Sequence, residues 1–342
     1  MIRRSAGVLG VLFALLFGAA VGEAAETQIG PRLALTRVNE SRSELVTVDP
    51  SGSNQQVLVD SHGPIELFAI SPSSWSADGG KLAFVGASGD NDFHLDIYVQ
   101  TVKDGEIFQV PGTRNGTHPL LSPDGHTVAF TRFKPGKPSK KQERGTEFAV
   151  WLADLGGGVV RRITPYKRHV SDVASSFSPD GSTLLLTRTV EGGAPAAVSI
   201  DLSRGRAAVI ARRASDPVYS PDGTQIAFER MPRQTLRKSG SNRHLFTDLY
   251  TMRADGSGIR RLTKTEKIAE VRPSWDPSGR RLAYLEVAES VGEGDFPFPE
   301  GSLGEINADG TCRTAIPTTP DPRIVGAVWQ PGSGREAGPI SC

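Results

Sequence analysis

A short turn followed by an apolar strand recurs along this chain and limits the folds that the chain can adopt. In one copy, Tyr219 is followed by Ser220-Pro221-Asp222-Gly223 and then by an apolar run at residues 226–228. Proline fixes φ at the second turn position, aspartate can bond to its own backbone, and glycine accepts the positive φ that closes the reversal. Because the apolar run shows no polar alternation, we expect a strand that is covered on both faces.

The turn occurs five times, at spacings that favour a repeat fold. The equivalent positions in the strands after the turns are 46, 56, 42 and 56 residues apart, and they are Leu82, Val128, Leu184, Ile226 and Leu282. A period of roughly 50 residues lies in the range of β-propeller blades. A second glycine-bearing turn recurs at Gly52, Gly105, Gly157, Gly205, Gly256 and Gly310. The two registers together predict six blades.

The sixth copy of the first register is split between the two ends of the chain. Residues 32–36 match the strand after the turn, and residues 327–331 match the strand before it. We therefore predict that the C-terminal strand pairs with the N-terminal strands, which closes the ring and leaves no open sheet edge there. The predicted fold is all-β, a six-bladed propeller of four-stranded antiparallel blades, in one domain over residues 26–342.

The first 25 residues have the layout of a secretory signal peptide. Arg3 and Arg4 precede an apolar run from Ala6 to Val21, and small residues follow it. We expect a signal peptide at residues 1–25 and a periplasmic or secreted mature chain without stable membrane insertion, with an uncleaved anchor as the alternative. The formal net charge of +1 argues against a nucleic-acid partner, which would favour a strong basic excess.

The repeat resembles that of TolB-type six-bladed β-propellers. The resemblance rests on the Ser-Pro-Asp-Gly turn, the apolar triplet, strands that begin at Asp96 or Asp248, and the segments 255–258 and 260–263, and it covers about residues 31–331. TolB proper looks like an α/β domain followed by a propeller, and we expect this chain to lack that first domain. The resemblance implies a protein-interaction module.

Both kinds of tight turn are expected on one face of the disc, so the long connections share the other face. Residues 133–146 and 231–245 are basic, whereas residues 286–301 are acidic and include a Phe-Pro-Phe-Pro run. Long connections without secondary structure are usually functional or disordered, and both interpretations remain open. The candidate partner-binding residues in these connections are Lys137, Lys140, Lys141, Arg237, Lys238, Phe296 and Phe298.

Mixed polar residues are expected at the ends of the inner strands, where they would ring the channel mouth on the long-loop face. Such a ring suits a ligand or an inserted segment of a partner, and plain solvation of a polar rim is the alternative. The residues are Glu66, His118, Asp172, Asp216, Arg272 and Arg323. We assign the aspartates of the tight turns to turn geometry instead.

The two cysteines are predicted to form a disulfide. Cys312 follows the glycine turn of the last blade on the tight-turn face, where the closing strand also ends. The tail from Gly332 to Cys342 can extend up to about 35 Å, enough to run from the channel to the rim. Two unpaired cysteines are the alternative.

Motifs for catalysis are missing from the sequence. It contains no Gly-x-Ser-x-Gly, and its six histidines show no metal-ligand spacing, so we expect no metal and no cofactor. The favoured function is a non-catalytic, monomeric, exported scaffold that binds a protein or a cell-envelope component through its long-loop face. A carbohydrate- or small-molecule-binding module at the channel mouth is one alternative, and a propeller enzyme such as a metal-dependent lactonase or a lyase is another.

Overall fold

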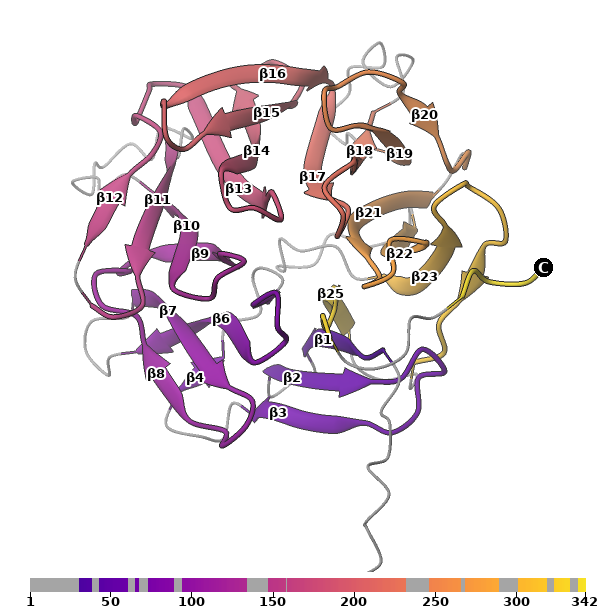
Figure 1. Cartoon of the computed structure of the whole chain (residues 1–342), viewed down its shortest axis with the longest axis horizontal. Coiled ribbons are helices and arrows are strands. Elements are labelled where there is room, and N and C mark those ends of the chain that lie inside the picture. Colours follow the sequence, from indigo (N-terminus) through magenta and orange to yellow (C-terminus); the bar gives the residue numbers. More distant parts are fainter. Residues whose placement is uncertain are drawn as a thin grey trace, which may run out of the picture.

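Six antiparallel β-sheets are arranged in a ring (Figure 1), and we call the region around its axis the channel. The structure is a computed structural model and describes residues 31–38, 43–60, 65–67, 73–88, 94–133, 147–157, 159–231, 246–265, 268–288, 301–318, 323–332 and 338–342. These residues form strands and turns and no helix, hence no helix long and apolar enough to cross a membrane. The expected all-β fold of six four-stranded blades is confirmed. The segment expected to be a signal peptide lies outside the described residues.

The first three blades follow one another along the chain, except that blade 1 takes its inner strand from the C-terminal end. From the channel outward, blade 1 contains β25 (Arg323–Trp329), β1 (Leu33–Val38), β2 (Ser43–Val48) and β3 (Gln56–Asp60). In blade 2, β4 (Glu66–Leu67) and β5 (Ser74–Trp75) both pair with β6 (Lys81–Ser88), followed by β7 (His94–Thr101) and β8 (Ile107–Gln109). Blade 3 contains β9 (Gly116–Leu121), β10 (Thr127–Phe133), β11 (Phe148–Asp154) and β12 (Val160–Arg162).

The remaining three blades repeat the same order. Blade 4 contains β13 (Val170–Phe177), β14 (Thr183–Val190), β15 (Ala196–Asp201) and β16 (Arg206–Arg212). Blade 5 contains β17 (Ala214–Tyr219), β18 (Gln225–Arg230), β19 (Asp248–Arg253) and β20 (Arg260–Arg261). Blade 6 contains β21 (Ile268–Trp275), β22 (Arg281–Ala288), β23 (Ser302–Asn307) and β24 (Thr314–Ala315).

The Ser-Pro-Asp-Gly turn is held by its own side chains. The Ser220 hydroxyl donates to Asp222 Oδ1 at 2.6 Å, and Gly223, at φ 72°, donates its N–H to the Ser220 carbonyl at 2.8 Å. In blade 6 the two polar residues exchange places: Asp276 begins the turn and accepts from the Ser278 hydroxyl at 2.6 Å. The turn therefore needs one hydroxyl and one carboxylate, in either order, and the prediction of turn geometry holds at these positions.

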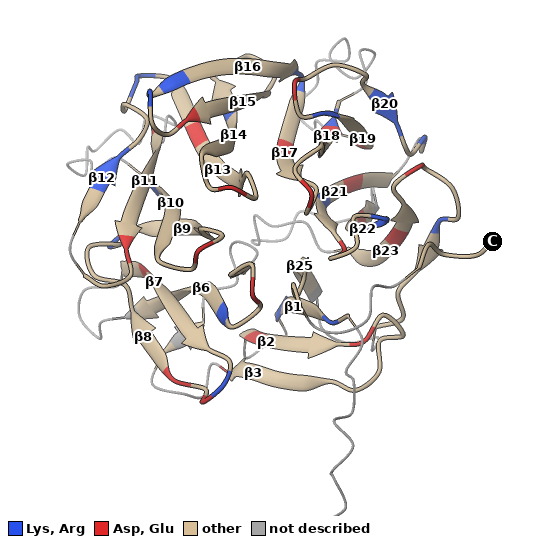
Figure 2. Cartoon of the chain, in the orientation of Figure 1, with Lys and Arg blue, Asp and Glu red and all other residues tan. Residues whose placement is uncertain are grey.

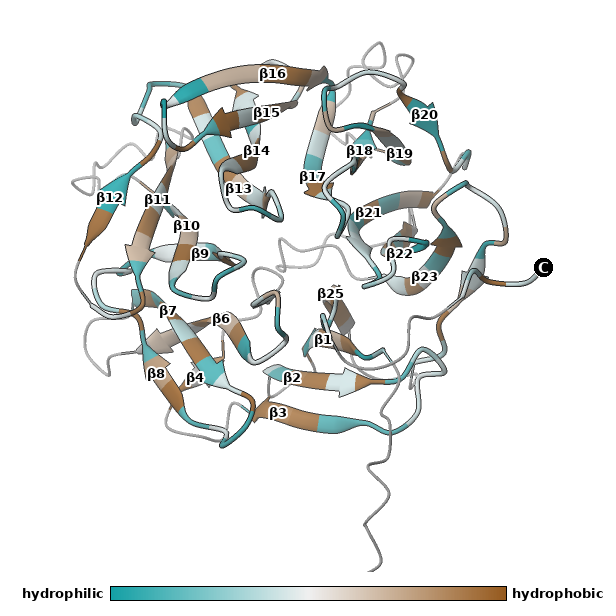
Figure 3. Ribbon diagram, viewed as in Figure 1, coloured by the Kyte–Doolittle hydropathy of each residue, from teal (hydrophilic) through white to brown (hydrophobic). Residues whose placement is uncertain are grey.

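The blades pack against one another through strands that are apolar on both faces, as expected for the run after the turn. Ile226, Ala227 and Phe228 of β18 are at most 1% exposed, and Phe228 belongs to a cluster that includes Ala197 of blade 4. Figure 3 shows the hydrophobic residues on the strands and mostly hydrophilic residues on the turns. At the next interface, the Trp275 indole donates to the Val218 carbonyl at 3.1 Å.

The ring is closed by β25, as predicted. It pairs antiparallel with β1, so that Leu33 lies opposite Trp329 and Leu35 opposite Ala327. These residues pack in one buried cluster with Leu285 of blade 6. A second buried cluster, which contains Leu45 of blade 1 and Leu82 of blade 2, joins blade 1 to its other neighbour.

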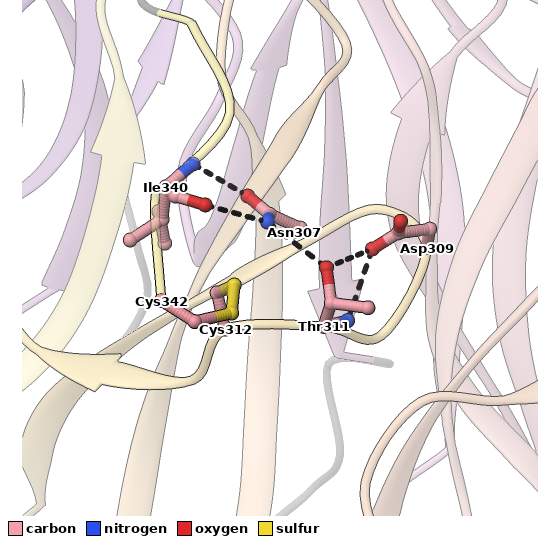
Figure 4. Close-up of a disulfide and its surroundings, with 6 residues drawn as sticks. All are labelled: Asn307, Asp309, Thr311, Cys312, Ile340 and Cys342. Atoms are coloured by element: carbon pink, nitrogen blue, oxygen red, sulfur yellow. Dashed lines mark hydrogen bonds between the residues drawn. A yellow bond between two sulfur atoms is a disulfide. The ribbon is translucent and has the colours of Figure 1, made fainter.

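A second fastening lies on the outer side of blade 6, where Cys312 and Cys342 form a disulfide with their Cα atoms 5.1 Å apart (Figure 4). The Asn307 side chain binds the same tail: its Nδ2 donates to the Ile340 carbonyl at 3.0 Å, and its Oδ1 accepts from the Ile340 N–H at 2.7 Å. An amide side chain therefore pairs with the tail as a neighbouring strand would, so the tail is fixed to blade 6 by both covalent and polar contacts.

Candidate functional site in the central channel

Three inner strands carry a bulge at the same place. In β9, β17 and β21, two residues lie opposite one aromatic residue of the second strand. The bulged pairs are His118-Pro119, Asp216-Pro217 and Arg272-Pro273. The first residue of each pair has a positive φ, 51° for His118, 45° for Asp216 and 57° for Arg272. Positive φ is uncommon for residues other than glycine, so three blades hold a strained residue at one height in the channel.

The side chains of these three residues converge in the channel. Burial lowers the pKa of His118 to about 4, with Asp216 acting in the opposite direction and Arg272 adding to the lowering. Blade 3 is a neighbour of neither blade 5 nor blade 6. The electrostatic interaction of His118 with Asp216 and Arg272 therefore crosses the centre of the ring.

Glu229 of β18 contacts this group and joins blade 5 to blade 6. Its side chain accepts the Arg272 backbone N–H at 2.7 Å and the Ser215 hydroxyl at 3.1 Å. The residue is only 6% exposed. Burial raises the pKa of Glu229 well above its usual value, and the nearby charge of Asp216 raises it further. This environment favours the neutral form of the carboxyl over the ionised form.

Between other neighbouring blades, a threonine hydroxyl takes the place of the Glu229 carboxyl and accepts a backbone N–H of the next blade. Thr131 Oγ1 accepts the Ala174 N–H at 3.0 Å, and Thr187 Oγ1 accepts the Asp216 N–H at 2.9 Å. Sequence reasoning missed Glu229, although a signal was present. The residue after the apolar triplet is threonine in these two repeats and an acid in the fifth.

The channel group offers donors and acceptors to a bound segment. Among the described residues, Arg272 Nη1 is buried and has no hydrogen-bond acceptor. An unmet buried donor is costly, so an incoming carbonyl or carboxylate oxygen would be stabilised there. The described residues contain no group of three or more His, Cys, Asp or Glu that could hold a metal ion.

Of the other residues expected at the channel mouth, Asp172 is paired within its own blade, and the side chains of Glu66 and Arg323 are not described. Asp172 is 2% exposed and accepts from Arg188 Nε at 2.7 Å and Nη2 at 2.8 Å, so it forms an interior ion pair. Glu66 pairs with Ala87 and Arg323 with Val38 through the backbone, and their side chains are not described. The candidate residues in the long loops also lie outside the described residues, namely Lys137, Lys140, Lys141, Arg237, Lys238, Phe296 and Phe298.

The tight-turn end of the channel is acidic. Figure 2 shows acidic residues at the tips of the inner turns around the opening. The exposed aspartates of these turns have lowered pKa values, chiefly because the first serine of each turn donates to them, and they are Asp78, Asp124, Asp180 and Asp222. Ionised carboxylates therefore rim the tight-turn end, whereas the middle of the channel carries Arg272 and a Glu229 carboxyl whose pKa is raised.

Replacing Glu229 with glutamine is expected to reduce the pH dependence of stability. The pKa of Glu229 is raised in the folded protein. Its contribution to the free energy of unfolding is therefore fully present below the unfolded-state pKa and is lost as the pH rises through the folded-state pKa. Glutamine keeps a neutral acceptor for Arg272, so Glu229→Gln should unfold at a similar denaturant concentration to wild type at pH 4.5 and at a higher one at pH 8.

Chemical denaturation at the two pH values measures this effect. Glu106→Gln, which changes an exposed acid, is the matched control and should change little at either pH. An equal loss of stability at both pH values in Glu229→Gln would show that the carboxyl is ionised in the folded protein.

The fold and its polar channel define this protein as a six-bladed β-propeller with a buried ionisable group at its centre. Residues 29–239 match the sequence model of the TolB beta propeller domain, and the chain belongs to this family. The crystal structure of TolB from Acinetobacter baumannii is similar, with a TM-score of 0.64 and 22% identity over 89% of this chain and 67% of that one. The putative TolB from Agrobacterium tumefaciens has a TM-score of 0.58 and 18% identity, over 86% and 91% of the two chains. These two likenesses show the fold.

Curated relatives match over shorter regions. The Tol-Pal system protein TolB of Anaeromyxobacter dehalogenans is 34% identical over 105 residues, which is 30% of this chain and 21% of that protein. The uncharacterized peptidase YuxL of Bacillus subtilis is 22% identical over 223 residues, 64% of this chain and 29% of that protein. The chain thus spans less than a third of the length of either relative.

Proposed function

We propose that this chain is an exported, non-catalytic propeller that binds another protein, or a component of the cell envelope, at the long-loop end of its channel. The observation that carries the proposal is the convergence of His118, Asp216 and Arg272, each with a positive φ, from three blades. Strained backbone persists where the surrounding structure enforces it, and it gathers at binding sites. Three such residues at one height therefore favour a binding role over simple solvation of the channel.

The proposed partner inserts a segment from the long-loop face. That segment meets a free donor on Arg272, a mainly neutral imidazole on His118 and the carboxyl group of Asp216. The tight-turn end is rimmed by carboxylates, so an acidic segment would be repelled there and admitted from the opposite face. Export to the periplasm or beyond is supported by the signal-like residues 1–25 and by relatives that carry the name Tol-Pal system protein TolB.

The proposal is tested by comparing partners of the wild-type chain and of the channel variant Arg272→Gln. Each protein is immobilised and exposed to envelope extract and, separately, to a glycan array. We expect proteins retained by the wild type to be lost at least tenfold in the variant, and Glu106→Gln to retain them. Equal retention by all three proteins would overturn the role of the channel, and specific retention of glycans alone would favour a carbohydrate-binding module.

The phenylalanines of the last long connection are proposed as the apolar anchor of the same contact. Aromatic residues often dominate interface energetics, so the double change Phe296→Ser and Phe298→Ser should abolish partner retention and leave the thermal midpoint nearly unchanged. Retention and thermal unfolding are measured on the same preparation. A lowered midpoint with unchanged retention would mean that the two rings cover the channel mouth. No change in the midpoint or in retention would show that the two phenylalanines do not anchor the partner.

A further inference from the structure

The outermost strand of blade 4 differs from those of the other blades. β16 has seven residues, whereas β3 has five, β8 and β12 have three each, and β20 and β24 have two each. Residues 206–209 are all exposed, and Val209 is 50% exposed. Because successive side chains of a strand point to opposite faces, both faces at this end are open to solvent.

The outer edge of β16 is unpaired in the described part of the chain. β16 ends its sheet and bonds only to β15. The next longest outer strand, β3, is partly covered, because the Gln100 side chain of blade 2 donates to the Leu58 carbonyl at 2.9 Å. The turn at Gly256 of blade 5 lies close to β16 at Ile210. A β-bulge at Ile210 interrupts the pairing of β16 with β15, so the regular part of the edge runs over residues 206–209. This part presents a row of backbone N–H and C=O groups to a partner strand.

Arginines flank this edge. Arg206 and Arg212 stand at the two ends of β16, are exposed, and form no ion pair with any described residue. The outer strands of the adjoining blades are also basic, with Arg161 and Arg162 in β12 and Arg260 and Arg261 in β20. Figure 2 shows these basic positions on β12, β16 and β20 along one half of the rim. The side of the molecule around β16 therefore favours an anionic partner.

A second copy of the chain fits this edge poorly. Pairing of this edge with the same edge of a second copy would bring the arginines at the two ends of each β16 close to those of the other chain. Like charges directly opposite each other destabilise a strand pair, and charged residues on an edge are a known protection against self-association. The same two charges stabilise a strand that carries acids at these positions.

We propose that the edge of β16 binds an extended acidic segment of another protein by strand addition. The added strand pairs with the exposed backbone of residues 206–209, and acidic residues near its two ends lie close to Arg206 and Arg212. Backbone pairing selects a polypeptide over other polyanions, and the arginines select its charge. This surface lies at the rim of blade 4, away from the channel, so it is independent of the function proposed above.

The experiment uses the full chain and the fluorescein-labelled peptide SETVTVTES, with SKTVTVTKS as the basic counterpart, followed by fluorescence anisotropy. We expect saturable binding of the acidic peptide only. The double variant Arg206→Glu and Arg212→Glu should bind the acidic peptide about tenfold more weakly and gain binding of the basic one. The double variant Lys103→Glu and Lys264→Glu changes exposed lysines elsewhere by the same total charge and should bind as the wild type does.

Two proline variants test the backbone contribution. Neighbouring N–H groups of a strand point to opposite edges, so only one of Ala208→Pro and Val209→Pro removes a bond to β15 and lowers the thermal midpoint. The other should keep its midpoint and lose the peptide. The proposal is overturned if the wild type binds neither peptide, if the lysine control loses binding equally, or if the stable proline variant binds normally. Concentration-dependent dimers that Arg206→Glu abolishes would overturn it as well, because a second copy would then occupy the edge.

Discussion

Removal of residues 324–342 is expected to abolish cooperative folding of the ring. The deletion takes away Ile324, Val325, Ala327 and Trp329, each at most 4% exposed. Burial of a large apolar side chain contributes roughly 1.5–3 kcal/mol, and a whole domain is stable by only about 5–15 kcal/mol. Loss of this one strand is therefore expected to remove most of the free energy of unfolding. It also leaves β1 as an open edge, which favours aggregation.

Circular dichroism melting and size-exclusion chromatography measure the outcome. Because the deletion also removes Cys342, the control is the full-length double variant Cys312→Ser and Cys342→Ser, which keeps β25. Addition of a synthetic peptide of residues 323–342 to the truncated chain should restore part of the lost signal. A truncated chain that stays monomeric with an unchanged melting temperature would show that β25 does not hold the ring closed.

The double variant Cys312→Ser and Cys342→Ser is itself expected to lose much of its thermal stability, which is the second large effect. The disulfide closes a loop with a sequence separation of 30 residues, and the chain-entropy model gives roughly 3–4 kcal/mol for a loop of this size. We expect the melting temperature to fall by about 5–10 °C. Reductant added to the wild type should reproduce the shift and should leave the double variant unaffected.

The tail also binds through Asn307, which offers a matched comparison. Asn307→Ala removes two hydrogen bonds to Ile340 and keeps the disulfide, so its effect should be smaller, about 1–3 kcal/mol. If Asn307→Ala lowers the midpoint as much as the cysteine changes do, the polar contact, rather than the crosslink, fastens the tail.

The repeat and the closure of the ring were predictable because their causes are local. A turn such as Ser220–Gly223 is built from four consecutive residues, and its hydrogen bonds reach no further along the chain than Gln225. Strand pairing between the chain ends followed from a missing half of one repeat. No distant contact had to be known for either prediction.

The channel was only partly predictable because it depends on contacts between blades. His118, Asp216 and Arg272 were expected together, and the structure brings them together. Asp172 was expected beside them, but it lies before the bulge and is held by Arg188, which is 16 residues away in sequence. Glu229 was missed because its role arises from the neighbouring blade, whose Arg272 donates to it.

Closure through β25 also dictates the order of folding. Leu33 and Trp329 face each other in adjacent strands, so blade 1 stays incomplete while almost all of the chain is synthesised and, if exported, translocated. Contacts between such distant positions form slowly, because the entropy cost of closing a long loop arises before the favourable contacts form. Blades 3 to 5 are assembled from contiguous segments and can form earlier. The last step is then the pairing of β25 with β1. Until that step, the edge of β1 is unpaired, and a chaperone would need to shield it.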